Sequence, residues 1–133
     1  MLLGNAPRAG GQWADNPVSA SWEIGTLSYA EMLSLPGHSY GDHYLARDGE
    51  PLPDFERPTR REIAEYYAAY PGMVGIEDVI YEEQEVSGIV RTRDGFEIGS
   101  HGIRCKHLVL ASGTFSINIP PPRELAPLSL IHI

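Results

Sequence analysis

The sequence predicts an α/β fold, with an α+β appearance in a chain of this length. Three observations support this prediction: an amphipathic helix at residues 60–70, a β-meander at 85–105, and a continuous apolar run at 107–111. A short apolar run bounded by turn residues is typical of a strand buried on both faces of a parallel sheet. We therefore expect one helix, an antiparallel meander and one buried parallel strand.

The helix at residues 60–70 has a start signal, an apolar face and a stop signal. Thr59 is a good N-cap, and Glu62 three residues later completes a capping box. One helical stripe at the i, i+3, i+4 and i+7 positions consists of Ile63, Tyr66, Tyr67 and Tyr70. Pro71 and Gly72 follow the stripe, and we expect them to end the helix.

The β-meander begins with a strand at residues 85–93. Asp94-Gly95 is a two-residue hairpin signal, and residues 96–98 form the return strand. Residues 99–102 then turn the chain into a third strand at 103–105. The apolar strand at 107–111 follows and ends in Ser112-Gly113.

The first third of the chain is rich in turn-forming dipeptides and poor in periodicity. Apart from one helical turn at residues 29–33, we expect it to form a long loop region. We therefore divide the chain into three parts. Residues 1–58 contain the G-G-x-W segment and the long loop region, residues 59–122 contain the helix, the meander and the apolar strand, and residues 123–133 are an end segment. A loop of this length usually has a function or faces a missing partner surface.

Residues 128–133 read Leu-Ser-Leu-Ile-His-Ile and match one reading frame of a transposon end used to build sequencing libraries. We interpret these six residues as a sequencing artefact and expect the natural protein to continue past about Pro127. The alternative is a short apolar C-terminal strand. A native stop codon after Ile133 in the source transcript would decide for that alternative.

Composition narrows the class of protein. The 133 residues have a net charge of −8 and no basic block, which argues against binding nucleic acid or an anionic membrane surface. The single cysteine, Cys105, cannot form an internal disulfide and favours a reducing compartment. The chain has neither a signal peptide nor the run of roughly 18 apolar residues that spans a bilayer. We expect a soluble, cytoplasmic protein without a membrane span.

Motifs for phosphate, zinc or serine-nucleophile chemistry are absent from the sequence. It contains no G-x-G-x-x-G, no H-E-x-x-H, no C-x-x-C and no G-x-S-x-G. His38 and His43 are five positions apart in a predicted loop, where solvated side chains are a better interpretation than metal ligands. Cys105 lies between Arg104 and Lys106, and we interpret it as a structural thiol. We therefore predict no metal site and name no catalytic residue.

Two segments have the properties of ligand-binding backbone. Gly10-Gly11-Gln12-Trp13 places two glycines, which tolerate positive φ and close approach of a ligand, before an aromatic ring that can cover a flat cofactor. Ser112-Gly113 follows the predicted parallel strand, at the strand end where α/β sheets place ligands. A loop with a core tryptophan and a tight strand exit are the structural alternatives.

The order of these segments resembles that of the flavin-containing monooxygenase superfamily. G-G-x-W, a long loop, the helix after Pro58, the Asp94-Gly95 hairpin and the Val-Leu-Ala-Ser-Gly run at 109–113 follow one another as in that family. Residues 33–37 (Leu-Ser-Leu-Pro-Gly) look most like the oxidative-stress-induced growth inhibitor branch. The resemblance implies part of a flavoprotein fold with two dinucleotide-binding domains, FAD as cofactor and NADPH in the full-length parent.

The resemblance also implies which residues meet FAD. Gly10, Gly11 and Trp13 match the G-G-x-W that lies against the cofactor, and Val86 matches a strand position at the adenine. The family's A-T-G segment beside FAD corresponds to Ala111, Ser112 and Gly113, with serine in place of threonine. The family's first βαβ unit, with its phosphate loop, has no counterpart here, and neither does the NADPH domain. We expect these missing parts of the same fold to be the chain's partners.

The resemblance therefore implies that the chain is a fragment of an FAD-dependent, NADPH-using monooxygenase-like oxidoreductase that acts on a small molecule. The fragment itself is expected to be inactive. Two alternatives remain open: a non-catalytic regulatory protein that keeps the flavoprotein fold, and a stand-alone α+β binding module.

Overall fold

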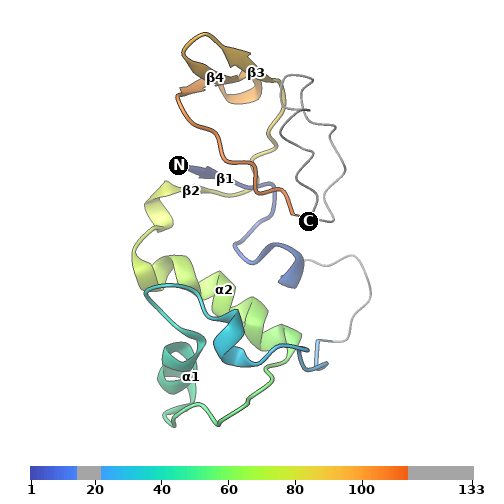
Figure 1. Cartoon of the computed structure of the whole chain (residues 1–133), viewed down its shortest axis with the longest axis vertical. Helices are drawn as coiled ribbons and strands as arrows, with labels where there is room; N and C mark the ends of the chain where they lie inside the picture. Colours follow the sequence, from blue (N-terminus) through green and yellow to red (C-terminus); the bar gives the residue numbers. More distant parts are fainter. Residues whose placement is uncertain (15–21, 114–133) are drawn as a thin grey trace. The chain divides into compact units, whose positions relative to one another are not determined.

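The computed structural model describes residues 1–14 and 22–113 (Figure 1). The chain divides into two compact units, Met1–Gln84 and Glu85–Ile133, each with a small sheet of its own. The expectations for the end segment 123–133 lie outside the described residues. Among the described residues, the two α-helices and two sheets agree with the predicted mixture of α and β structure. In this part of the chain no helix combines the length and apolar character that crossing a bilayer requires.

The first unit is built around helix α2 (Arg60–Val74), which confirms the predicted helix and its capping box. Thr59 Oγ1 accepts from the Glu62 amide at 3.3 Å, and a Glu62 carboxylate oxygen accepts from the Thr59 amide at 2.8 Å. The predicted apolar stripe faces the core: Ile63 and Tyr66 are fully buried. They pack with Ala30 and with Tyr40 of the preceding helix.

The predicted end of the helix is wrong, because α2 continues through Pro71 to Val74. Pro71 lies inside the helix, where it cannot donate a backbone hydrogen bond and its ring crowds the carbonyl four residues earlier, yet the helix continues past it. The helix ends where Gly75 adopts a left-handed conformation, with φ 72°. The Gly75 amide then donates to the Gly72 carbonyl, and the Ile76 amide donates to the Pro71 carbonyl at 2.9 Å. This is the Schellman pattern that satisfies the last carbonyls of a helix.

The predicted loop region at 1–58 contains a helix that the sequence reasoning missed. The helical turn expected at 29–33 is confirmed as the 3₁₀ helix η2 (Ala30–Leu33), and α1 (Tyr40–Asp48) follows it. α1 begins with a reciprocal capping box in which Asp42, not glutamate, accepts from the Ser39 amide at 2.8 Å. It ends at Gly49, with φ 77°. Gly41-Asp42, one of the turn-forming dipeptides of the predicted loop region, therefore belongs to the first turn of a helix.

Three tyrosine hydroxyls of α2 fix the backbone of residues 33–38. Tyr66 donates to the His38 carbonyl at 2.6 Å and accepts from the Leu35 amide at 2.8 Å. Tyr67 donates to the carbonyl of Leu33 at 3.1 Å, and Tyr70 donates to that of Pro36 at 2.5 Å. The apolar stripe predicted from sequence thus also supplies hydrogen bonds to a segment that contains the end of η2 and a single antiparallel bridge between Leu35 and His38.

The parallel sheet lies at a different place from the one predicted. β1 (Leu2–Leu3) pairs in parallel with β2 (Ile80–Tyr81), and the connection between these strands contains both α-helices. Loop bonds extend the pairing: the Gly4 amide donates to the Tyr81 carbonyl at 3.0 Å, and the Gln84 amide donates to the Gly4 carbonyl at 2.8 Å. Strands of two residues produce no detectable periodicity, which explains why the sequence did not reveal them.

The second unit contains the predicted meander, formed by β3 (Ile89–Thr92), β4 (Gly95–Ile98) and β5 (Ile103–Cys105). The hairpin is confirmed, but its two loop residues are Arg93 and Asp94, because Gly95 pairs with Thr92 inside the ladder. The 3₁₀ helix η4 (Gly99–His101) makes the predicted turn into β5. Ile98 is buried in the middle of the sheet, between Ile89 and Ile103.

The buried parallel strand predicted at 107–111 is wrong. The segment has no strand assignment, and the side chains of Val109 and Leu110 are 86% and 56% exposed. A strand depends on a neighbouring strand for its backbone hydrogen bonds. Among the described residues no strand pairs with this segment, so its apolar character alone does not make it a strand.

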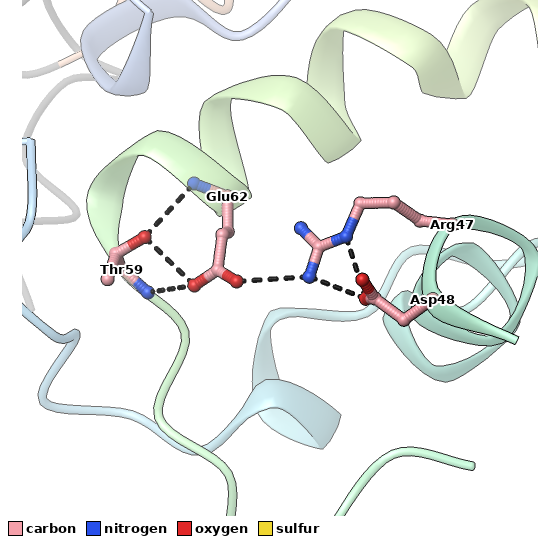
Figure 2. Close-up of polar contacts among 4 residues, drawn as sticks. All are labelled: Arg47, Asp48, Thr59 and Glu62. Atoms are coloured by element: carbon pink, nitrogen blue, oxygen red, sulfur yellow. Dashed lines mark hydrogen bonds and ion pairs between the residues drawn. The ribbon is translucent and has the colours of Figure 1, made fainter. Parts of the chain in front are cut away.

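A polar network joins the end of α1 to the start of α2 (Figure 2). One Arg47 terminal nitrogen lies 2.7 Å from an Asp48 carboxylate oxygen and 3.1 Å from a Glu62 oxygen. The other Glu62 oxygen accepts the two hydrogen bonds from Thr59. Burial acts to raise the pKa of Glu62, but the bonds from Thr59 and Arg47 outweigh it and hold the pKa below its usual value. The ion pair is partly exposed and contributes little, so the cap is the larger part of this network.

Removal of the Glu62 side chain is the first test of this arrangement. Glu62→Ala is expected to lower the free energy of unfolding by about 1 kcal/mol, because the Thr59 amide loses the carboxylate that accepts its hydrogen bond, while the Thr59 cap itself remains. Glu65→Ala, on an exposed position of the same helix, is the matched control. Because the folded pKa of Glu62 lies below its unfolded value, its contribution is present above pH 4.5 and is lost as the pH falls through the folded pKa. Urea unfolding at pH 7 and pH 3 should therefore show a difference between wild type and Glu62→Ala that shrinks in acid. A constant difference would contradict this.

Candidate functional site

The G-G-x-W segment forms a tight turn whose two glycines both have positive φ. Gly10 has φ 119° and Gly11 has φ 48°, and the 3₁₀ helix η1 (Gly11–Trp13) begins there. A Cβ on Gly10 would lie 3.1 Å from the Cβ of Ala14, so the turn itself requires a glycine at this position. A Cβ on Gly11 would meet nothing within 4 Å. The bare Cα of Gly11 therefore faces open space, where a ligand can approach the backbone closely.

Trp13 is fixed against α2 by two contacts. Its ring meets Tyr67 edge to face, with centroids 6.3 Å apart, and its carbonyl accepts from Arg60 Nε at 3.1 Å. Arg60 is only 9% exposed, so this hydrogen bond is shielded from water. Burial, assisted by the neighbouring Tyr66, raises the pKa of Tyr67 and keeps its phenol a hydrogen-bond donor at neutral pH. The half-buried indole is thus held in one position at the start of α2.

A shallow pocket lies on the neighbouring face of α2. Its volume is about 150 Å³, and it is lined by Arg8, Trp22, Arg61, Ala64 and Glu65. The guanidinium of Arg60 lies 4.3 Å from the centre of the Trp22 ring, and Arg61 pairs with Glu23 at 2.5 Å. Pockets that enclose a drug-sized ligand measure about 300–1,000 Å³, so this one can hold only part of a large ligand.

The structure brings three of the seven predicted cofactor residues together: Gly10, Gly11 and Trp13. The other four belong to the second unit. Val86 is half-buried and precedes β3, outside the strand in which it was expected. Ala111, Ser112 and Gly113 are exposed and follow β5 without forming the strand exit that the sequence suggested. Gly113 has φ 74°.

Three further residues of this site were missed at the level of sequence. Arg60 and Tyr67, seven positions apart on one face of α2, hold Trp13, while Trp22 stacks with Arg60. Their helical spacing was a detectable signal, but Tyr67 was assigned to the core and Arg60 only to the helix start. Within the described residues no three His, Cys, Asp or Glu side chains gather as a metal site.

Comparison with protein-family models, with curated proteins and with solved structures found no match to this chain.

Proposed function

We propose that this chain is part of the FAD domain of an NADPH-using, monooxygenase-like oxidoreductase that acts on a small molecule. The observation that carries the proposal is the open backbone at Gly11, directly before an indole held by Arg60 and Tyr67. Exposed backbone beside a fixed aromatic ring suits a large flat cofactor. The parallel pairing of β1 with β2 across a helical connection supports the proposal, since dinucleotide-binding domains use such connections.

When bound, FAD would supply the redox chemistry, and the protein would bind and orient it. Gly10 and Gly11 would let the backbone approach the cofactor, and Trp13 would cover one part of its surface. Arg60 holds the Trp13 carbonyl and so would position the backbone of this turn, while Tyr67 contacts the indole. The glycine-rich loop that would bind the pyrophosphate is not among the 133 residues, so the proposed site is only partial.

Flavin binding by the full-length protein tests the proposal. Gly11→Ala is expected to weaken FAD binding at least about tenfold, equivalent to about 1.4 kcal/mol, because the methyl group fills the open space at the turn. Gly49→Ala is the matched control: Gly49 also has positive φ and open space around it, but it lies at the end of α1. Both variants carry a similar backbone strain, so equal FAD binding in the two would overturn the assignment of Gly11 to the site.

The two alternatives predict different results for the same purified protein. A regulatory protein that keeps the fold would show no visible flavin absorbance and no NADPH oxidation. A stand-alone binding module would have no G-x-G-x-x-G in frame upstream of Met1 in the genomic sequence. An in-frame phosphate loop together with bound flavin would support the oxidoreductase over both.

A further inference from the structure

The start of α1 contains an unusual pair of histidines. Ser39 is the N-cap, so His38 occupies the position before the cap and His43 the fourth helical position. Helices commonly place two apolar side chains at these two positions, where they pack together and fix the entry of the chain. Here the two imidazole rings take that place, edge to face, with centroids 6.3 Å apart and an interplanar angle of 88°.

Both imidazoles lie in an aromatic environment. The Tyr66 ring is 6.4 Å from the His38 ring and 5.5 Å from the His43 ring, and Tyr40 is 6.3 Å from His43. Tyr40 and Tyr66 are almost completely buried. Nε2 of His38 is buried and has no hydrogen-bond partner. A buried polar atom without a partner costs free energy, and a charged one costs more.

We propose that this histidine pair makes the docking of α1 sensitive to pH: the packed rings hold the start of the helix, and protonation of His43 in mildly acidic solution weakens that packing. A positive charge on His43 would then lie beside the His38 ring, near the positive end of the helix dipole. Release of α1 would withdraw Tyr40 from the core and the His38 carbonyl from the Tyr66 hydroxyl. The device is independent of flavin binding.

The charged groups around the pair shift the pKa of His43 in opposite directions. Within α1, Asp42 faces His38, and Asp48 and Arg47 face His43; from α2, Glu65 faces His43. Tyr40 and Tyr66 complete the surroundings without charge, since burial raises the pKa of both phenols. Burial, followed by Arg47 and His38, lowers the pKa of His43, while Glu65 and Asp48 oppose the shift only in part.

The lowered pKa of His43 determines how the stability of the fold depends on pH. The pKa of His43 in the folded protein lies below its ordinary value of 6.5, so the unfolded chain binds more protons in this range. Stability is therefore lost as the pH falls from about 6.5 toward the folded pKa. For a histidine that stays neutral in the fold, the unfolding equilibrium constant rises at most about eightfold between pH 7 and pH 5.5.

The test compares the 133-residue chain with three variants by urea unfolding at pH 7 and pH 5.5, followed by far-UV circular dichroism. Wild type and His107→Leu, a change at an exposed histidine, should both lose stability in acid. His43→Leu should lose less, up to eightfold less in the equilibrium constant, and His38→Leu/His43→Leu should also lose less than wild type. An acid loss in the double variant equal to that of wild type would overturn the proposal.

A second measurement needs no variant of the pair. The proton NMR signal of the His43 ring in wild type should titrate at a lower pH than a histidine in a short unstructured peptide. The α1 amides should exchange faster with solvent at pH 5.5 than intrinsic exchange rates explain, while those of α2 keep their protection. A His43 signal that titrates with the peptide would overturn the proposal even if the variants fail to fold.

Discussion

Gly95→Ala is expected to unfold the three-stranded sheet of the second unit, at a cost of about 3–5 kcal/mol. Two effects add. Gly95 has φ 148°, a conformation that L-residues with a side chain rarely adopt, and a Cβ there would lie 2.1 Å from the carbonyl oxygen of Cys105. Because the contact is with backbone of the neighbouring strand, no side chain can move to relieve it. β4 and β5 would have to separate.

The single thiol of the chain provides the measurement. Cys105 is half-buried in β5, so a thiol reagent should label it slowly in the wild type and several-fold faster in Gly95→Ala. Gly102→Ala is the matched control, because Gly102 also has positive φ (62°) but open space around its Cα. It should cost only about 1–2 kcal/mol and leave labelling slow. Equally slow labelling of Gly95→Ala would show that the strands tolerate the methyl group.

Tyr66→Phe is expected to destabilise the first unit by about 2–4 kcal/mol while leaving no cavity. The hydroxyl both donates to the His38 carbonyl and accepts from the Leu35 amide, so its removal leaves two backbone groups without partners. Burial raises the pKa of Tyr66, and the phenol is therefore a donor throughout the neutral range. Urea unfolding at pH 7 gives the difference directly.

The control for this substitution comes from the same helix. Tyr70→Phe removes a hydroxyl that makes one hydrogen bond, to the Pro36 carbonyl, and this bond is exposed to solvent although the Tyr70 ring is half-buried. Water can replace that bond, so the loss should be about 1 kcal/mol or less. If the two substitutions cost the same, the double hydrogen bond of Tyr66 does not hold residues 33–38.

Local chemistry made α2 and the hairpin predictable. The Thr59–Glu62 capping box and the apolar stripe act within a few residues, and the turn at Asp94-Gly95 acts within two. For both α2 and the hairpin, the prediction was wrong only about where one end of the element lies. α2 passes Pro71 because Gly75 offers a better cap, and Gly95 enters the ladder because β5 runs close beside it. The position of β5 beside Gly95 is not visible in the local sequence.

Other errors have tertiary causes. α1 depends on an aspartate version of the capping box and on burial of Tyr40 against α2, and neither gives a strong pattern in nine residues. The apolar run at 107–111 has the composition of a buried strand but no strand beside it in the described chain. Of the candidate site, the G-G-x-W turn was predicted from its glycines. The contributions of Arg60 and Trp22 could not be predicted, because they depend on contacts between segments that are distant in the sequence.

The three phenols of α2 also determine where substitutions can be accepted. Residues 33–38 obtain key backbone partners from Tyr66, Tyr67 and Tyr70, so their conformation depends on a helix about thirty positions away in the chain. Side chains of this segment that point to solvent can be exchanged without loss of its shape. A redesign of the segment should therefore keep the tyrosines, and also Leu33 and Leu35, which pack against the core, and Gly37, which has φ 85°. The exposed Pro36 is the position of this segment that can be varied.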